Sequence, residues 1–547
     1  MPLRSSGFLP GALFLFDVFC HNGRMNADIQ TVLNYHERTK HRPWRYAASP
    51  GYLDWATQPD PYRTYDGAKH IALPLPAETG GSAYARLFEG GEAPSALTKA
   101  SVSQLLRFSM GLAAIKTDGH SQWALRCNAS SGNLHPTEAY VLLPPMQEVS
   151  ETANLYHYLP KTHTLERLQP CDASVFEGLP KGAFFVVLAS IAWREAWKYG
   201  ERAFRYVHLD AGHALRSMTV AAKMQGWHCR IVDACTSRLD AALGFDTYAY
   251  ADALEHEHAD MLMLVTPEIC EIETVALPPL SGATAFPNRL SPAHRPWPVI
   301  EAVEQATSGA PTCSRVRAEE AGCTRGGNRN AAAVILGRRS ARQMDPERSP
   351  MPRETFMQLL CSVRGSCDGF EPTAELILFV HRVEGLRSGL YLYNRNADQN
   401  DALRSVLDGR FGFETVGSGL YALEYGDFRA YAKAFSCAQD IASDGAFMAA
   451  MLVPTGRELR HCGAARYKSL YHECGAVGQQ LYLEATSLGY DATGIGCFLD
   501  DEVHRFLGIE NGSWQVLYHF TVGRAVPDTR VQTLQPYSAV CRVDEGG

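Results

Sequence analysis

Two stretches of the chain are apolar on every side of the helix that each would form. Residues 212–226 and 475–489 are rich in Ala, Leu, Met and Val and carry few charges, a pattern typical of buried helices. Each stretch ends in a glycine, which favours termination of a helix. Apolar runs with strand character occur at 139–143, 375–380 and 514–522. The pattern predicts an α+β protein with buried helices.

The two halves of the chain repeat one spacing of glycines. Gly200, Gly212 and Gly226 are matched, each 263 residues later, by Gly463, Gly475 and Gly489. Shorter matches flank them in the same order: Leu243-Gly244 with Leu507-Gly508, and Pro136-Thr137 with Pro372-Thr373. A colinear series of this length indicates an internal duplication. We therefore expect two homologous domains that pack as a pseudo-dimer within one chain.

The expected domain boundaries follow from the repeat and from local composition. Residues 1–90 are an N-terminal extension, 91–285 a first domain, 286–330 a linker rich in Pro, Ala, Thr and Gly, and 331–547 a second domain. Residues 1–24 form an irregular start to the chain. The apolar run 8–20 within them is too short for a membrane helix and is a poor signal peptide.

One short segment of the second half concentrates positive charge. It contains Arg338, Arg339, Ser340 and Arg342. In an extended chain positions 338, 340 and 342 share one face, so two guanidinium groups and a hydroxyl can contact one anion, such as a phosphate. A solvated basic turn is the alternative. Further along, Gly494, Ile495 and Gly496 allow close approach of the backbone to a ligand, and Arg524 follows a strand-like run.

The first half contains a loop of small hydrogen-bonding side chains just before a predicted strand. Its candidate binding residues are Arg126, Ser130, Ser131 and Asn133. Hydroxyl, amide and backbone donors of this size can reach the edge of a planar heteroaromatic ring. An ordinary Asn/Ser/Gly turn is the alternative.

At these residues the chain resembles the flavin-dependent nitroreductase family, and in particular its SagB/ThcOx branch of azoline-oxidising dehydrogenases. The matching segments are 338–342, 130–136, 494–496 and 522–524. The resemblance implies two tandem nitroreductase-fold domains, each a mostly antiparallel sheet wrapped by helices, and FMN bound at their interface. In that family one subunit contributes the arginines and glycines, and the other contributes the serine loop, whose usual proline is Ala129 here.

Each half of this chain retains only one of these two sets of residues. The second half keeps the arginine segment but has an altered loop at 364–372, whereas the first half keeps the loop but has no arginine segment near 83–91. We therefore expect one composite FMN site per chain. Lys198 and Tyr199 resemble the pair that the branch uses for proton transfer, although a surface lysine and a packed tyrosine are the alternative. Gln439 lies where the branch often places a polar residue near the flavin ring.

The resemblance implies an FMN-dependent oxidoreductase that transfers hydride from a peptide-derived or small natural-product substrate to the flavin. Two alternatives remain: an NAD(P)H-dependent nitro or quinone reductase, and a flavin-binding scaffold without catalysis. A monomeric pseudo-dimer or a homodimer would satisfy the family's interface. The His-rich stretch 255–260 and the set His208, Asp210 and His213 invite a metal hypothesis, but surface polarity and packing are favoured there.

The composition of the chain indicates which classes of partner and which cellular compartment to expect. With 51 Lys and Arg against 59 Asp and Glu, the net charge of −8 does not favour nucleic-acid binding. No apolar run is long enough to span a membrane. The 15 cysteines are an odd number and form no C-x-x-C motif, which favours free thiols in a reducing cytoplasm over a disulfide scaffold or a zinc ribbon.

Overall fold

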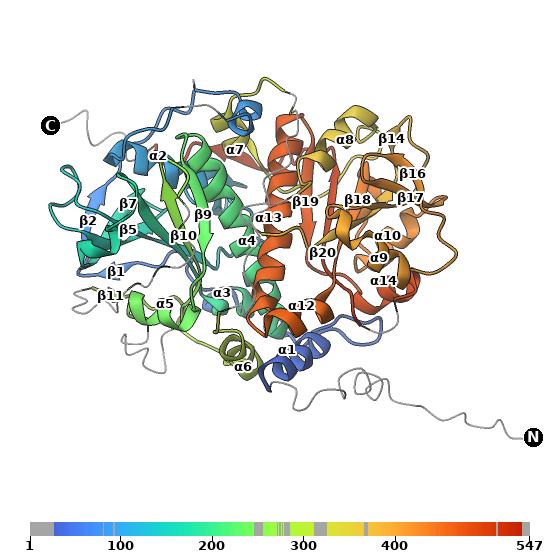
Figure 1. Cartoon of the computed structure of the whole chain (residues 1–547), viewed down its shortest axis with the longest axis horizontal. Coiled ribbons are helices and arrows are strands. Elements are labelled where there is room, and N and C mark those ends of the chain that lie inside the picture. The colour runs from blue at the N-terminus through green and yellow to red at the C-terminus, as the bar shows by residue number, and fades with distance from the viewer. Residues whose placement is uncertain are drawn as a thin grey trace, which may run out of the picture.

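The structure, a computed structural model, describes residues 27–538 of the chain with several gaps. The gaps are 80, 91–92, 246–254, 271, 273–274, 276, 278–284, 311–324, 326, 366–369 and 510–511. The irregular start that we expect at residues 1–24 therefore lies outside the described residues. Figure 1 shows the two large β-sheets, one in each half of the molecule, with helices between them.

Each half contains one seven-stranded sheet. The first has the order β2 (Lys69–Ala72), β7 (Thr164–Pro170), β6 (Asn154–Leu159), β5 (Thr137–Leu143), β8 (Phe184–Ser190), β10 (His258–Thr266) and β9 (His228–Val232). The second has the order β16 (Glu414–Gly417), β17 (Leu420–Tyr425), β15 (Gly389–Tyr393), β13 (Glu375–Val380), β18 (Phe447–Val453), β20 (Gln515–Gly523) and β19 (Asp491–Ile495). Every neighbouring pair in both sheets is antiparallel.

The two sheets are connected in the same way around their central strands. In the first half β8 is followed by α3 (Ala192–Tyr199), α4 (Ala203–Lys223), β9, α5 (Thr236–Leu243) and β10. In the second half β18 is followed by α12 (Thr455–Cys462), α13 (Arg466–Ser487), β19, α14 (Asp500–Leu507) and β20. The correspondence therefore extends from the glycine spacing to the path of the chain.

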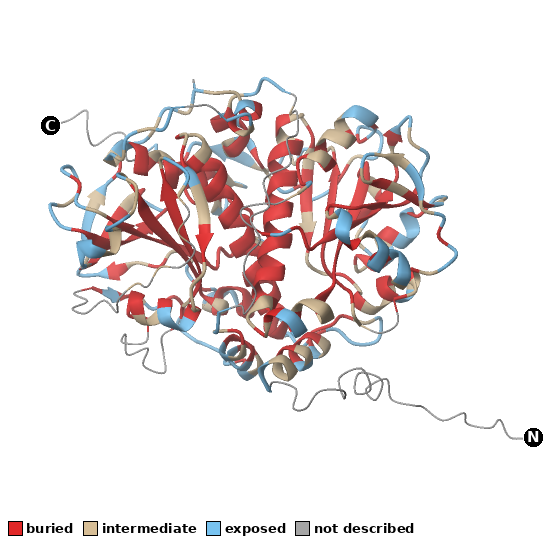
Figure 2. Cartoon of the chain, viewed as in Figure 1, coloured by how far each residue is buried: buried red, intermediate tan, exposed pale blue. Residues whose placement is uncertain are grey.

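The helices α4 and α13 lie side by side between the two sheets (Figure 1). Almost every residue of both is buried (Figure 2), so the predicted buried helices at 212–226 and 475–489 are confirmed. Both begin earlier than the apolar pattern indicates. Gly226 and Gly489 follow their ends with φ of 66° and 79°, a left-handed conformation that favours glycine. The same device ends α5 and α14 at Gly244 and Gly508.

The remaining helices are α1 (Ala27–Arg38), α2 (Lys99–Ser109), α6 (Pro298–Ala306), α7 (Ala331–Gly337), α8 (Arg353–Cys361), α9 (Asn400–Val406), α10 (Arg429–Phe435) and α11 (Ile441–Asp444). Of these, α2 packs on α4, and α7 and α8 contact α13. The first turn of α2 is fixed by a capping box between Thr98 and Ser101. Among the described residues, no helix is both long and apolar enough to cross a bilayer.

Several segments connect regions that are distant in sequence. The N-terminal segment supplies β2 to the first sheet, and its α1 packs on α6, which lies within the expected linker 286–330. Short pairs join β1 (Tyr65–Asp66) to β11 (Phe286–Pro287) and β12 (Met351–Pro352) to β14 (Val383–Glu384). Near the C-terminus β21 (Gln532–Leu534) returns to pair with β3 (Leu112–Thr117), beside β4 (Gln122–Arg126). The halves thus exchange segments.

The cysteines only partly match the expected free thiols. Eight described cysteines are free: Cys127, Cys171, Cys229, Cys235, Cys270, Cys437, Cys474 and Cys497. Cys361 and Cys462 are disulfide-bonded, so the prediction is wrong for these two, because an odd total says nothing about which individual thiols lie close together.

Candidate functional site

The serine loop of the first half has an unusual backbone. Gly132, Asn133 and His135 have φ of 59°, 61° and 51°, and the last two are residue types that pay a cost for this conformation. Side chains hold the loop in place: Asn133 Nδ2 donates to the Ala124 carbonyl at 2.9 Å, and the His135 amide donates to Ser130 Oγ at 2.8 Å. A strained loop that is this well supported is typical of a binding site.

Asp210 of α4 is hydrogen-bonded to the same loop. Its carboxylate accepts hydrogen bonds from the Ser131 amide at 3.0 Å and from Ser131 Oγ at 2.9 Å. Burial raises the pKa of Asp210 to about 7, although the bonds from Ser130 and Ser131 act in the opposite direction. The loop is thus attached to a carboxyl group that titrates close to neutral pH.

Arg338 of the second half reaches into this loop. It directly follows α7, and its guanidinium donates from Nε to the Cys127 carbonyl at 2.9 Å and from Nη2 to the Arg126 carbonyl at 3.1 Å. Gln479 of α13 accepts a bond from the Ala129 amide at 3.2 Å. The structure therefore brings together the arginine segment of one half and the serine loop of the other.

The cations at this junction lack carboxylate partners in their hydrogen bonds. Among the described residues, Arg338 and Arg339 donate only to carbonyl oxygens, and Nη1 of Arg338 has no hydrogen-bond partner. Burial lowers the pKa of Arg338, and burial together with Arg338 lowers that of Arg339 to about 10. Lys116 adds a third cation, whose pKa is lowered by burial and by Arg339. One buried cation with two partly buried ones beside it fits an anion such as a phosphate.

The other predicted arginines lie in different settings. Arg342 is exposed and pairs with Asp528 at 3.6 Å, and the Arg524 guanidinium lies 4.5 Å from the centre of the Tyr490 ring. Arg126 is buried and donates to the carbonyls of Pro61 and Thr137. Its guanidinium is therefore used to brace the loop, whereas those of Arg342 and Arg524 carry no hydrogen bond to a backbone carbonyl in the described structure.

The glycines at 494 and 496 are required by close neighbours. A Cβ on Gly494 would lie 1.7 Å from Tyr518 Oη, and one on Gly496 would lie 2.3 Å from Cε1 of Tyr206. Ile495, between them, is buried in the core. The Gly494 amide donates to Tyr482 Oη at 2.9 Å, and the same Tyr482 oxygen lies 2.8 Å from Ser340 Oγ. Tyr482 therefore connects the arginine segment to the glycine strand.

Lys198 and Tyr199 lie against the serine loop, at the end of α3. A Cβ on Gly132 would be 2.6 Å from Tyr199 Oη and 3.1 Å from Lys198 Nζ. The Tyr199 ring lies 4.7 Å from that of Tyr206, whose hydroxyl donates to the Gly496 carbonyl at 3.2 Å. These contacts form a continuous path from the loop to the glycine strand.

Gln439 contacts the residue after the glycine pair. Its Nε2 donates to the carbonyls of Ser436 at 2.7 Å and Cys497 at 3.2 Å. The amide is therefore used in part to hold two backbone segments together.

Glu195, one turn before Lys198, is a candidate site residue that no sequence motif indicates. It is fully buried, and neither carboxylate oxygen has a hydrogen-bond partner among the described residues. Burial raises its pKa well above the usual value, Asp210 raises it further, and Lys198 acts in the opposite direction. Spacing to Lys198 is the only signal in the sequence, and acidic residues three positions before lysines are too common to single it out.

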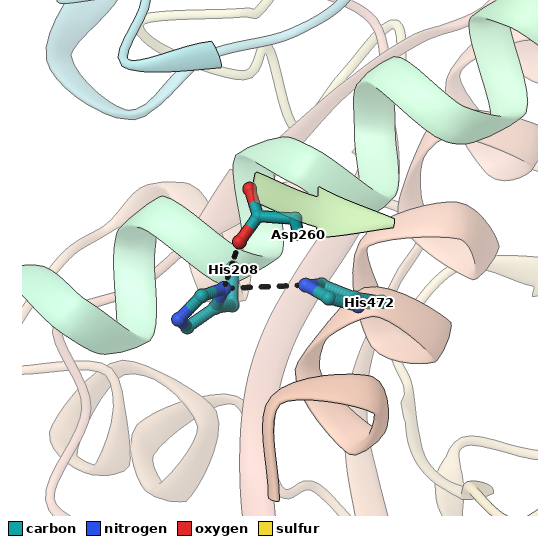
Figure 3. A group of neighbouring side chains, drawn as sticks. All are labelled: His208, Asp260 and His472. Carbon is teal, nitrogen blue, oxygen red and sulfur yellow. Dashed lines mark hydrogen bonds and ion pairs between the residues drawn. The ribbon is translucent and has the colours of Figure 1, made fainter. Parts of the chain in front are cut away.

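A second buried cluster lies between α4, β10 and α13, and Figure 3 shows its three side chains converging. Nδ1 of His208 is 3.2 Å from Nε2 of His472 and 3.3 Å from a carboxylate oxygen of Asp260, and the three donor atoms lie within 4.8 Å of one another. Such a set could bind a transition metal. Nε2 of His208, however, faces Glu304 at 3.6 Å, and Glu304 also pairs with Lys468 at 3.3 Å. Each ring nitrogen of His208 thus faces a carboxylate, and one of these carboxylates also pairs with Lys468, so we assign no metal.

Parts of this sequence and its fold are similar to those of known proteins. Residues 335–524 match the model of the nitroreductase family. A candidate nitroreductase of Methanocaldococcus jannaschii is 31% identical over 107 residues, which are 18% of this chain and 52% of that protein. The chain thus spans about half the length of this curated relative. The crystal structure of a candidate nitroreductase from Anabaena variabilis superimposes with a TM-score of 0.67 at 22% identity, over 91% of this chain and 99% of that one. The chain therefore has the fold of the Anabaena protein, and its residues 335–524 match the nitroreductase family.

Proposed function

We propose that the chain is an FMN-dependent oxidoreductase with one composite flavin site formed by two tandem nitroreductase-like domains. The observation that carries this proposal is the contact of Arg338 with the serine loop. It joins a buried arginine of one half, which has a side-chain nitrogen without a hydrogen-bond partner among the described residues, to a strained hydrogen-bonding loop of the other. The matched connections of the two sheets support a duplication, and the match of 335–524 to the nitroreductase family supports the flavin chemistry.

The donor set of the site fits FMN at its phosphate end. Arg338, Arg339 and Ser340 would hold the phosphate, with Arg342 and Arg524 at its edge. The backbone at Gly494 and Gly496, with Ser131 and Asn133 from the other half, would hold the ring and the ribityl chain. When bound, FMN supplies an acceptor for two electrons as a hydride.

Lys198 and Tyr199 are the residues that we propose to move protons. Both contact Gly132 at the tip of the serine loop, and both are only partly buried. An ammonium group at this point stabilises developing negative charge, and a phenol can donate or relay a proton to a substrate atom. Glu195, whose pKa is raised by burial, lies one helical turn before Lys198 in α3.

The reaction that we propose is dehydrogenation of a peptide-derived or small natural-product substrate. This proposal rests on the resemblance of the 198–199 pair and of the site motifs to the SagB/ThcOx branch. Rapid bleaching of bound flavin by NADH or NADPH would instead identify a nitro or quinone reductase. Bound flavin with neither activity would indicate a scaffold.

The first experiment is to quantify the flavin released per chain from purified or reconstituted protein. We expect one FMN per chain, and R338A should abolish or strongly reduce it. R505A is the matched control, because Arg505 is an exposed arginine that pairs with Glu502 on α14. Two flavins per chain would contradict the composite site, and none after reconstitution would contradict the proposed function.

A further inference from the structure

Two cysteines from distant parts of the chain meet beside the glycine strand. Cys497 directly follows Gly496, and Cys437 lies in the turn between α10 and α11. Their Sγ atoms are 2.8 Å apart, both thiols are free, and both residues are only partly buried. Two thiols at this separation can be joined without a large movement of the backbone.

The turn that carries Cys437 is held in an uncommon conformation. Cys437 and Ala438 are consecutive non-glycine residues with φ of 54° and 60°, which is rare because a Cβ disfavours the left-handed region. The Gln439 side chain holds the turn by donating to the carbonyls of Ser436 and Cys497. The surrounding structure therefore maintains a strained backbone that places one sulfur against the other.

Cys497 also lies in surroundings that favour a thiolate. The hydrogen bond between the two thiols lowers the pKa of Cys497, and His41 and Arg202 lower it further, although burial acts in the opposite direction. His41 is fixed by a bond from the Ala47 amide at 3.0 Å, and Arg202 donates to the Gly496 carbonyl at 3.2 Å. A thiolate is the form that attacks a disulfide, so Cys497 is the nucleophile of the pair.

The pair is connected to the proposed flavin site through a single carbonyl. The Gly496 carbonyl accepts bonds from both Tyr206 and Arg202. Tyr206 contacts Tyr199, and Cys497 is the next residue along the chain. The sulfur pair is thus placed at the edge of the same site by the residues that shape it.

We propose that Cys437 and Cys497 form a reversible dithiol–disulfide couple that exchanges electrons with low-molecular-weight thiols and with the bound flavin. This rests on the proposed function only for the flavin partner. In the oxidised form an external thiolate attacks the disulfide to give a mixed disulfide and one free cysteine. A second external thiolate attacks the mixed disulfide, which releases the other cysteine as a thiol and forms a disulfide between the two external thiols.

The exchange with flavin is balanced in the same way. As the S–S bond forms, the Cys437 thiol and the Cys497 thiolate lose two electrons and one proton. A bound oxidised flavin would take up both electrons and that proton. The couple gives the site a second two-electron carrier, and external thiols become a source of reducing equivalents.

The first test needs no flavin. The full-length protein is equilibrated in mixtures of reduced and oxidised dithiothreitol, alkylated, and digested for mass spectrometry. We expect a Cys437–Cys497 linked peptide that forms and disappears reversibly as the mixture changes. The C235S variant should behave as the wild type, because Cys235 is a part-buried thiol that bonds to Ser237 elsewhere in the structure. Two fully alkylated thiols in every oxidising mixture would overturn the couple.

The second test counts electrons in the flavin-loaded protein. In an anaerobic dithionite titration, the oxidised wild type and C235S should take up one more electron pair per flavin than C437S and C497S before excess reductant appears. The comparison between variants cancels any uptake by the disulfide-bonded Cys361 and Cys462. Equal uptake in the wild type and both variants, with the linked peptide present, would overturn the exchange with flavin. A protein that binds no flavin would refute the proposed function and that exchange, while the first test would still decide the thiol couple.

Discussion

Gly212 and Gly475 lie directly against each other where α4 crosses α13. A Cβ on Gly212 would lie 2.1 Å from the His472 carbonyl oxygen, and one on Gly475 would lie 2.0 Å from the Leu209 carbonyl oxygen. Leu209 and His472 are themselves separated by the repeat interval of 263 residues. The contact is therefore reciprocal, as at the two-fold axis of a symmetric dimer.

Substitution of either glycine by alanine should strongly destabilise the protein. The obstructing atoms belong to backbone carbonyls, which cannot rotate away, so the helices must separate. We expect G212A to lower the free energy of unfolding by about 3 kcal/mol, as measured by urea denaturation. G409A is the control, since a Cβ there would meet nothing within 4 Å. Equal stability of G212A and wild type would show that the crossing is looser than the structure indicates.

The repeat in the sequence predicts the central part of the fold. It does not predict the segments that pack against distant parts of the chain. Glycines at a fixed spacing and apolar runs are local signals, and they locate α4, α13 and the strands beside them. The pairing of β21 with β3 and the packing of α1 on α6 are contacts between distant parts of the chain, which leave no periodic pattern in either partner.

Removal of the Arg338 side chain should weaken flavin binding without abolishing the fold. Loss of charge-assisted bonds to a phosphate is worth about 2 kcal/mol, or about thirtyfold in affinity. Fluorescence titration of apo protein with FMN measures it, with R505A as the control. Because Arg338 also bonds to the carbonyls of Arg126 and Cys127, thermal unfolding of R338A should be recorded in parallel. A folded R338A with unchanged FMN affinity would remove Arg338 from the site.

The stability of the protein should depend on Asp210 between acidic and neutral pH. The pKa of Asp210 is about 7 in the folded protein, against about 3.9 in an unfolded chain. The folded state therefore binds the Asp210 proton more tightly than the unfolded chain does. The protonated carboxyl stabilises the protein at low pH, and this stabilisation is lost as the pH rises from about 4 to about 7. The loss amounts to up to about 4 kcal/mol. D210N, which carries no charge, should lose this dependence. Parallel profiles for D210N and wild type would contradict the assignment.

The candidate site could be predicted from short motifs, but the use of each side chain could not. The types and spacing of Arg338, Ser340 and the two glycines indicate a phosphate and a flat ligand. They do not show that the Arg126 guanidinium donates its hydrogen bonds to backbone carbonyls. A buried arginine and a ligand-binding arginine cannot be distinguished by sequence alone. The contact of Asp210 with Ser131 depends on tertiary packing and also has no local signal.

The cluster around His208 should make stability fall at alkaline pH. Burial alone would lower the pKa of His208, but Asp260 and Glu304 raise it above the usual value. The stability that protonated His208 contributes is present in full below about pH 6.5, the pKa of histidine in an unfolded chain. It is lost as the pH rises through the pKa of His208 in the folded protein. H208Q should flatten this part of the profile of unfolding free energy against pH. Stabilisation of the wild type by added Zn²⁺, absent in H208Q, would instead indicate a metal site.

Lys198 and Tyr199 should affect turnover far more than flavin binding. Neither is among the residues that we assign to the phosphate, whereas both contact the tip of the serine loop. Loss of a group that transfers a proton typically slows a reaction by about 100-fold to 10,000-fold. We therefore expect K198M and Y199F to bind FMN as the wild type does and to oxidise substrate slowly, with the pH profile of kcat altered in each. K181M is the control, because Lys181 is an exposed lysine on a loop of the same half. Wild-type turnover in both variants would show that the pair only packs against the loop, and the proton-transfer role would have to pass to Glu195.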